Sequence, residues 1–380
     1  MIIDPNEPAA TPTLVSRRRL LGRSLQGVAF LGAAGGISAF LAACGSSTKS
    51  SSSSTSAGAA SASTSASTAA TAALTSVAAQ YCYLLNVQFA GSYFATVNGY
   101  YTADGLKVDL LPGGPSIAPE PVVASGRALV GVTHTAEAVQ AMINGAPLKI
   151  IGATFQKNPT CIASLASKPL KTPTDMYGRK IGISDTNQPI WQSFVKANQL
   201  DVSKINVVTV GFDVTSLASG EIDGIMAFAP NEPSILKLNG VDTYVMLLSD
   251  FKYPLMEDLY IARASDVADP ARMKLLAAFM KAESLGWSDV LKNPDQAAQL
   301  AVNQFGKGLG LSLAQQQLDV AAQNAFVADT DTQTHGLFWM TDQKVSGTIS
   351  SLALGGVTAD PSMFTNSVLT EVYHGGSTPV

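Results

Sequence analysis

One carboxylate in the sequence has the chemistry of a ligand contact. Glu232 lies in the motif APNEP, directly after a predicted strand. A carboxylate accepts two hydrogen bonds in one plane, which matches paired N–H groups on an amino-substituted heterocycle. Because a buried carboxylate without a partner is costly, a donor-rich ligand would account for Glu232. The alternative is that Glu232 stabilises the first turn of the helix that begins at Pro233.

Amide, aromatic and glycine residues accompany Glu232 at other predicted strand ends. Amides can donate and accept at the edge of a heterocycle, and aromatic rings can stack on a flat ligand. Each residue type also has a purely structural alternative, in loop capping, the core, a plain turn or a helix start. The candidates are the amides Asn86, Gln88, Gln156, Asn187 and Asn231, the aromatics Phe89, Tyr93, Phe155 and Trp191, the glycines Gly113 and Gly114, and the helix-start residues His134, Thr135 and Thr186.

Cationic and metal-binding patterns are scarce around these candidates. The predicted strand-end loops hold one basic residue, Lys157. This scarcity counts against phosphate, sulfonate or nitrate as the main ligand, although helix N-termini alone can bind an anion. The three histidines are far apart and neither HExxH nor CxxC occurs, so we expect no metal site and no cofactor. Cys82 and Cys161 could form a disulfide or remain free thiols.

Short apolar strands alternate with helical stretches, which predicts an α/β fold with parallel sheets covered by helices. Ligands of such sheets bind beyond the carboxyl ends of the strands, where the candidate residues lie. The predicted strands are 81–87, 106–112, 128–132, 148–154, 179–184, 205–210, 224–228 and 243–249. The predicted helices are 90–99, 136–144, 189–198 and 233–239, then a long helix after residue 269, followed by 294–305 and 313–326.

Length and composition suit a sizeable folded part with two lobes or one large α/β domain. The chain has 380 residues, of which 46% are hydrophobic and 14% charged, and its formal net charge is −4. The positive charge is concentrated near the N-terminus. No basic patch for nucleic acid is indicated.

The N-terminal 43 residues have the layout of an export signal. Arg17, Arg18 and Arg19 precede an apolar run, 27–43, that is too short and too rich in Gly and Ala for a convincing spanning helix. The stretch SRRRLL resembles a twin-arginine signal, although a Sec signal can also be rich in arginine. The segment LAAC resembles a lipobox, which implies a diacylglycerol on Cys44 and cleavage before it. Residues 44–79, mostly Ser, Thr and Ala, are predicted to be a disordered tether.

The folded part resembles the NMT1/THI5-like (SsuA/THI5-like) family, from about residue 81 to residue 369. The resemblance rests on the runs GYYTADGLKVDLLPGGP, ATFQKNP, PLKTPTDMYGRKIGIS and NEPSILKLNGVDTYVMLLSDFKYPL. It implies a type 2 periplasmic-binding-protein fold with two lobes joined by a two-strand hinge. Lobe 1 would comprise 80–168 and 250–375, with the C-terminal helices, and lobe 2 would comprise 169–249.

The family also implies a function. Its receptors bind a small molecule between the lobes and deliver it to an ABC permease and its ATPase. We therefore expect a monomeric lipoprotein on the outer face of a bacterial cytoplasmic membrane. A thiamine pyrimidine precursor is the first expected ligand, with riboflavin, sulfonate or nitrate as alternatives. The family's pyrimidine-making enzymes carry a cysteine-rich motif that this sequence lacks, so we expect no enzyme, and a surface role in sensing or adhesion stays open.

Overall fold

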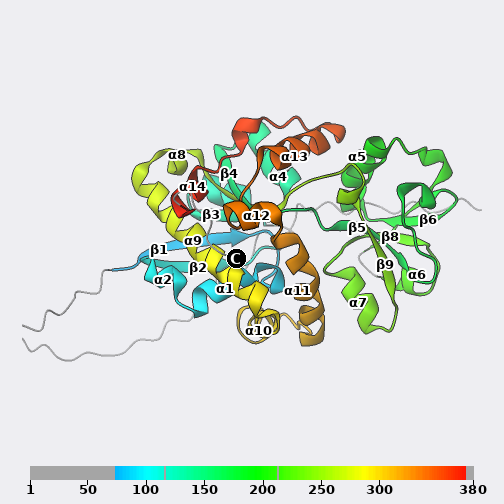
Figure 1. Cartoon of the computed structure of the whole chain (residues 1–380), viewed down its shortest axis with the longest axis horizontal. Coiled ribbons are helices and arrows are strands. Elements are labelled where there is room, and N and C mark those ends of the chain that lie inside the picture. The colour runs from blue at the N-terminus through cyan, green and yellow to red at the C-terminus, as the bar shows by residue number, and fades with distance from the viewer. Residues whose placement is uncertain (1–72, 115–116, 212–213, 374–380) are drawn as a thin grey trace, which may run out of the picture. The chain divides into compact units, whose positions relative to one another are not determined.

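A computed structural model describes residues 73–114, 117–211 and 214–373 (Figure 1). The predicted export signal, Cys44 and most of the predicted tether lie outside the described residues. The strands form two sheets of five. The first sheet contains β1 (Thr75–Tyr81), β2 (Leu106–Leu111), β3 (Val130–Thr133), β4 (Leu148–Phe155) and β10 (Glu257–Arg263). The second contains β5 (Thr160–Leu165), β6 (Lys180–Ile183), β7 (Asn206–Thr209), β8 (Gly224–Phe228) and β9 (Thr243–Leu247).

In the first sheet the strand order is β2-β1-β3-β10-β4. Strand β1 pairs in parallel with β2 on one side and with β3 on the other. Strand β10 pairs antiparallel with both β3 and β4. The carboxyl ends of β1 and β3 therefore lie at the same edge of the sheet. The next two strands in the chain, β2 and β3, lie on opposite sides of β1.

In the second sheet the strand order is β7-β6-β8-β5-β9. Strand β6 is parallel to β7 and β8, whereas β5 is antiparallel to β8 and β9. The chain passes from the first sheet to the second through 156–159 and returns through 248–256. Each sheet thus takes in one strand, β5 or β10, that runs against its neighbours.

Helices cover both sheets. The helices α3, α4, α9, α11 and α14 contact strands of the first sheet, while α6 and α7 contact strands of the second. The described helices are α1 (Ala90–Val97), α2 (Tyr100–Ala103), α3 (Pro119–Ala124), α4 (Thr135–Ile143), α5 (Gln188–Asn198), α6 (Thr215–Ala218), α7 (Glu232–Leu238), α8 (Ala264–Ala268), α9 (Pro270–Lys292), α10 (Pro294–Leu300), α11 (Leu313–Val327), α12 (Thr330–His335), α13 (Asp342–Leu354) and α14 (Ser367–Tyr373).

The long helix α9 shows how local sequence and packing agree. Pro270 is its first residue, and the Asp269 carboxylate accepts hydrogen bonds from the N–H groups of Ala271 and Arg272, which is a standard helix start. Helix α1 packs directly against α9. A methyl group on Gly286 of α9 would lie 2.0 Å from the Gly91 carbonyl oxygen, so only glycine permits this close approach.

The prediction of an α/β fold with alternating strands and helices is confirmed, with three differences. The first strand is Thr75–Tyr81 rather than 81–87, so the last residues of the predicted tether belong to the sheet. Strands β5 and β10 were missed. Because of them both sheets are mixed rather than parallel, and 160–165, predicted as part of lobe 1, pairs within the second sheet.

The errors at β1 and β10 each have a reason in the local sequence. Strand β1 begins with small and polar residues, TSVAAQ, at an exposed end, which local composition does not distinguish from the Ser/Thr/Ala tract before it. Strand β10 contains two acidic residues, Glu257 and Asp258, which local propensity disfavours in a strand. Their burial is decided by tertiary partners described below.

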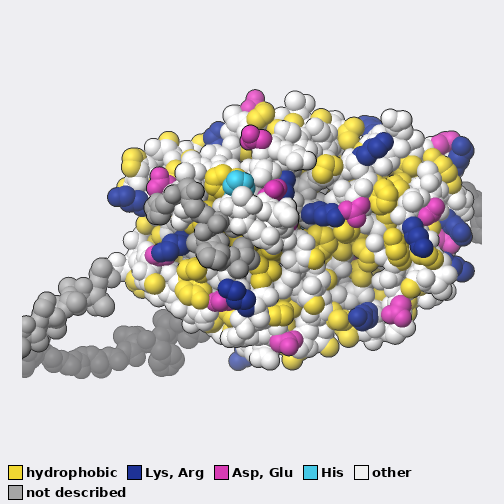
Figure 2. All heavy atoms as spheres, in the orientation of Figure 1, with side chains coloured by type: hydrophobic (Ala, Val, Ile, Leu, Met, Phe, Trp, Pro, Cys, Tyr) yellow, Lys and Arg dark blue, Asp and Glu magenta, His cyan; other side chains and the backbone are white. Residues whose placement is uncertain are grey.

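Surface charge and helix length are clear in the part of the chain that the structure describes. On the face drawn in Figure 2, Lys and Arg side chains are scattered among Asp and Glu and do not form one basic patch. Among the described residues, no helix combines the length and the apolar character needed to cross a membrane.

Candidate functional site

A cavity of about 430 Å³ lies beyond the carboxyl ends of β1 and β3. This is the point where the connections from parallel strands diverge, and α/β sheets commonly bind ligands there. Among the described residues, the lining contains a thiol, an imidazole and two carboxylates, and no Lys or Arg. The lining residues are Cys82, Ile117, Ala118, Pro119, Glu120, Thr133, His134 and Glu137.

His134 is held in place by the buried carboxylate of Glu257. It occupies the N-cap position of α4 without a side-chain cap bond, and its Nδ1 lies 3.0 Å from Glu257 Oε1. The Thr135 N–H also donates to Glu257 Oε1, at 3.3 Å, and Asn158 Nδ2 donates to Oε2 at 2.9 Å. Both oxygens of Glu257 are thereby engaged, and the imidazole has a set orientation.

Asp258 follows Glu257 directly, yet its carboxylate reaches the same imidazole. Its Oδ1 lies 3.9 Å from His134 Nδ1. In a regular strand successive side chains point to opposite faces. The φ of Asp258 is 52°, a left-handed conformation that interrupts this alternation. Strain of this kind needs compensation from its surroundings and is most common at functional sites.

The Asp258 carboxylate is only half satisfied. Its Oδ2 accepts a hydrogen bond of 2.7 Å from Gln88 Nε2. Its Oδ1 is buried and has no hydrogen-bond partner among the described residues. Asp258 as a whole is 1% exposed, so water does not compensate for the missing partner. An unpartnered buried carboxylate oxygen is energetically unfavourable.

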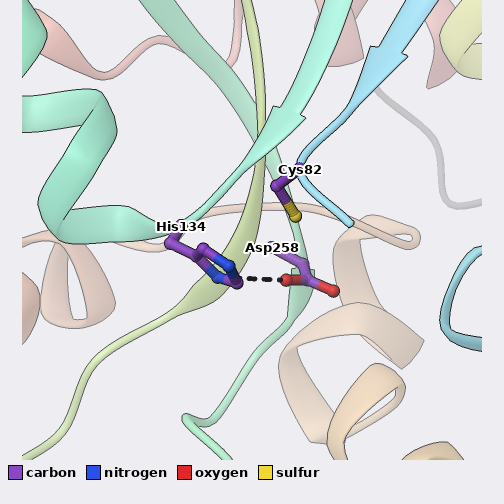
Figure 3. A group of neighbouring side chains, drawn as sticks. All are labelled: Cys82, His134 and Asp258. Carbon is purple, nitrogen blue, oxygen red and sulfur yellow. Dashed lines mark ion pairs between the residues drawn. The ribbon is translucent and has the colours of Figure 1, made fainter. Parts of the chain in front are cut away.

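Cys82 completes a cluster with His134 and Asp258. The three side chains converge from the end of β1, the start of α4 and the start of β10 (Figure 3). The Cys82 Sγ, a ring nitrogen of His134 and a carboxylate oxygen of Asp258 all lie within 4.8 Å of one another. The set combines a thiol, an imidazole and a carboxylate at one edge of the cavity.

A glycine allows the chain to pass beside Cys82. A Cβ on Gly113 would lie 2.2 Å from the Tyr81 carbonyl oxygen and 2.4 Å from the Cys82 carbonyl carbon. The Gly113 N–H donates a 2.9 Å hydrogen bond to Tyr83 O. The loop after β2 therefore supports the backbone that carries Cys82, and only a residue without a side chain fits.

The pKa values of Asp258, His134 and Cys82 are shifted by burial and by the charged groups around them. Burial raises the pKa of Asp258 to about 7, although His134 and the Gln88 hydrogen bond oppose the shift. The pKa of His134 is raised well above its usual value, first by the Cys82 sulfur and then by Glu257. Burial also raises the pKa of the Cys82 thiol. A cation placed here would stabilise the anionic forms of Cys82 and Asp258.

Two further carboxylates make the cavity acidic. Glu120 is 4% exposed, and its carboxylate accepts a hydrogen bond from the Thr133 hydroxyl. Glu137 lies on the first turn of α4 and is exposed. The lining thus offers hydrogen-bond acceptors in excess of donors, which suits a donor-rich or cationic ligand.

Four of the predicted site residues lie at this cavity or beside it. His134 lines it, and Gln88 binds Asp258. The Thr135 hydroxyl donates to Met256 O at 2.6 Å, while its N–H binds Glu257. Gly113 supports the Cys82 backbone, whereas Gly114 has open space around its Cα.

The four predicted aromatic residues are in the core. All are at most 4% exposed, and each ring contacts another ring. Their partners are Tyr81 for Phe89, Phe305 for Tyr93, Phe228 and Phe326 for Phe155, and Phe194 for Trp191. The structure therefore favours the structural alternative for these rings, and stacking on a ligand has no support here.

Glu232 and Asn231 bind each other, and each also has a partner in a neighbouring element. Glu232 Oε2 accepts from the Phe228 N–H at 2.7 Å, and Oε1 accepts from Asn231 Nδ2 at 3.1 Å. Asn231 Oδ1 accepts from Gln315 Nε2 at 3.1 Å. Both carboxylate oxygens of Glu232 thus have partners within the chain, and neither residue lines the cavity.

The remaining amide predictions also have local partners. Asn86 Oδ1 accepts from the Gln88 N–H at 3.0 Å. Gln156 Nε2 donates to Ala153 O at 2.8 Å, and its Oε1 accepts from Lys344 Nζ at 2.7 Å. Asn187 occupies the N-cap position of α5 without the expected side-chain bond. The Thr186 side chain lies outside the described atoms.

Sequence reasoning missed five residues of the site. Cys82 was considered only as half of a disulfide with Cys161 or as a free thiol, not as a site residue, and both cysteines are free thiols. A signal was present in the run YPLMEDLYIA, because two adjacent acids inside an apolar strand need partners. The missed residues are Cys82, Glu120, Glu137, Glu257 and Asp258.

Comparison with known proteins identifies the fold and the family of this chain. The periplasmic sulfonate-binding protein SsuA from Methylobacillus flagellatus, described as part of a putative sulfonate ABC transporter, superposes with a TM-score of 0.59 at 16% identity. The match covers 81% of this chain and 98% of that chain. The chain therefore has the fold of periplasmic binding proteins. The model of the family described as NMT1/THI5 like matches residues 86–297, and the chain belongs to that family.

Two curated relatives have named ligands. The riboflavin-binding protein RibY of Chloroflexus aurantiacus is 26% identical over 80% of this chain and 88% of its own length. The formylaminopyrimidine-binding protein of Halalkalibacterium halodurans is 26% identical over 54% of this chain and 63% of its own length. Both names describe binding proteins rather than enzymes.

Proposed function

We propose that this chain is an extracytoplasmic receptor of an ABC importer for a small, donor-rich heteroaromatic molecule, with an aminopyrimidine precursor of thiamine as the first candidate. The observation that carries the proposal is the acidic cavity at the carboxyl ends of β1 and β3. Glu120, His134 and Glu137 line it, and no Lys or Arg is among its described lining residues. Carboxylates facing a cavity complement N–H donors on a ligand.

The same cavity disfavours an anionic cargo. Receptors for sulfonate or nitrate need cationic forks, point charges or open helix N-termini. Here the start of α4 directs its first N–H, that of Thr135, to Glu257, so a carboxylate of the chain already occupies that position. Charge therefore supports a pyrimidine ligand over the anions bound by other members of the fold.

Riboflavin is the second candidate, and one observation favours it. The riboflavin-binding relative aligns with 80% of this chain, more than the formylaminopyrimidine-binding relative does. An isoalloxazine ring also carries an N–H donor and a broad flat face. The described cavity supplies acceptors but no exposed aromatic wall, which weakens this alternative.

Membrane attachment and transport belong to the same proposal. A lipid on Cys44 would hold the receptor at the membrane surface, beside a permease and its ATPase. Ligand binding would bias an equilibrium between open and closed lobes, and the permease would bind the closed form. We infer no catalytic activity, because a receptor needs only binding and release.

A thermal-shift screen tests the ligand class. The panel contains hydroxymethylpyrimidine, formylaminopyrimidine, thiamine, riboflavin, taurine and nitrate. A ligand at 100 times its Kd adds about 2.7 kcal/mol of stability. A shift with a pyrimidine that is lost in Glu137→Gln supports the proposal, and a shift with riboflavin alone selects the second candidate. A shift only with taurine or nitrate overturns the argument from charge.

A further inference from the structure

We propose that Cys82, His134 and Asp258 form a binding site for a divalent metal ion of the zinc class. The proposal goes beyond the import function and does not depend on which organic ligand the cavity takes. Thiolate, imidazole and carboxylate are the ligands that zinc prefers in proteins. The three candidate ligand atoms already lie within 4.8 Å of one another.

The geometry needs only a small contraction to become a coordination site. Ligand bonds to zinc of about 2.0–2.3 Å place neighbouring ligand atoms about 3.3–3.8 Å apart. A closure of about 1 Å by side-chain rotation is therefore enough. The His134 side chain is 43% exposed, which leaves the cluster accessible from solvent. Three protein ligands would leave a fourth position open toward the cavity.

An independent observation points to a missing cation. Asp258 Oδ1 is buried and has no hydrogen-bond partner among the described residues. A left-handed φ of 52° brings this carboxylate to the cluster. Backbone strain and an unsatisfied buried acceptor are both unfavourable. A metal ion bound to Oδ1 would compensate for both.

Glu257 has the position of a residue that orients a metal ligand. Metal-binding histidines commonly donate their second ring N–H to a carboxylate, which sets the tautomer. Glu257 Oε1 lies 3.0 Å from His134 Nδ1. A proton on Nδ1 leaves the other ring nitrogen, Nε2, free to coordinate. Glu257 is itself held by Asn158 and by the N–H of Thr135, so the imidazole is pre-oriented.

Cobalt(II) titration of the purified full chain with reduced thiols tests the site. We expect one cobalt per chain and a sulfur-to-cobalt charge-transfer band in the near-ultraviolet. Cys82→Ser should abolish the band, whereas Cys161→Ser and Cys44→Ser should keep it. Zinc competition with a chromophoric chelator should show at least about 10-fold weaker binding in Asp258→Asn, His134→Gln and Glu257→Gln. Glu257→Gln should keep the band, because Glu257 orients His134 and does not bind the metal.

Four results would overturn the proposal. The first is the absence of a band in the wild-type chain. The second is a band that survives Cys82→Ser. The third is unchanged zinc affinity in both Asp258→Asn and His134→Gln, with folding confirmed by circular dichroism. Rapid alkylation of Cys82 without any metal uptake would also contradict the site and would identify a reactive thiol instead.

Discussion

The Nδ1 atom of His134 lies 3.0 Å from Glu257 Oε1, although one residue precedes and the other follows the segment that builds the second sheet. This pair joins the end of β3 to the start of β10. Those strands are antiparallel neighbours in the first sheet, so the contact exists only once the chain has completed the second sheet and returned.

The protonation of His134 should respond to its neighbours. Cys82 first, and then Glu257, raise the pKa of His134 well above its usual value. Replacing Glu257 by Gln removes a nearby negative charge, so the pKa of His134 should fall. An NMR titration of the histidine ring resonances measures this change. The resonance of His335, on α12, serves as the internal control, and an unmoved His134 would refute the assigned contact.

Stability should fall as the pH rises from about 4 to about 7, and Asp319 contributes to that fall. Burial raises the pKa of Asp319 to about 7, and Glu232 adds to the shift. The folded state thus holds a proton that the unfolded chain releases near pH 4. The stability from this group is complete below about pH 4, is lost through pH 7 and changes little above it.

Asp319→Asn should flatten that dependence. The variant removes at most about 4 kcal/mol of pH-dependent free energy, from a shift of about three units. Urea unfolding at several pH values gives the slope for the wild-type chain and the variant. Asp242 is an exposed acid directly before β9, so Asp242→Asn is the control and should keep the wild-type slope. Equal slopes for the wild-type chain and Asp319→Asn would contradict the prediction.

A buried carboxylate in the core of the first sheet should be important for stability. Glu283 accepts hydrogen bonds from Ser92 Oγ at 2.6 Å, from Tyr260 OH at 2.8 Å and from Tyr101 OH. Glu283→Ala would leave three buried hydroxyls without their acceptor, so we expect a loss of about 3–5 kcal/mol. Chemical denaturation measures it. The exposed Glu371→Ala should stay within about 0.5 kcal/mol of wild type, and a similar value for Glu283→Ala would refute the network.

Adjacent glycines provide a matched test of the loop beside Cys82. A Cβ on Gly113 would clash with the Tyr81 carbonyl oxygen at 2.2 Å, whereas a Cβ on Gly114 meets no described residue within 4 Å. Gly113→Ala should therefore lower stability by about 1–3 kcal/mol and displace Cys82. Gly114→Ala should behave like wild type. Thermal unfolding and the reactivity of the Cys82 thiol distinguish them, and indistinguishable variants would count against the close approach of Gly113 to the backbone of Tyr81.

Lipid attachment can be separated from ligand binding. Cys44→Ser should release the chain from membranes, because the proposed diacylglycerol is bonded to that sulfur. Ligand affinity should be unchanged, since the cavity lies in the described part of the chain. Membrane fractionation followed by the thermal-shift screen measures both properties. Retention of Cys44→Ser in the membrane fraction would show that another segment provides the anchor.

Local sequence was sufficient for most of the secondary structure. Hydrophobic periodicity and breakers such as Pro270 and Gly99 act within a few residues of themselves. For this reason the predicted strands at 106–112 and 224–228 agree with β2 and β8 to within a residue. The absence of clustered cations is likewise a property of composition, and it remained informative once the cavity was located.

The family could also be predicted from the sequence, but the composition of the site could not. Glu232 had the right chemistry for a ligand contact, yet its oxygens bind Phe228, at the end of β8, and the adjacent Asn231. Aspartate is disfavoured in strands, yet in the folded chain the Asp258 carboxylate lies beside His134 and Cys82. The reason is physical: residue type and periodicity act locally, whereas burial, left-handed backbone and convergence of distant side chains arise only when strands from separate segments pair in one sheet.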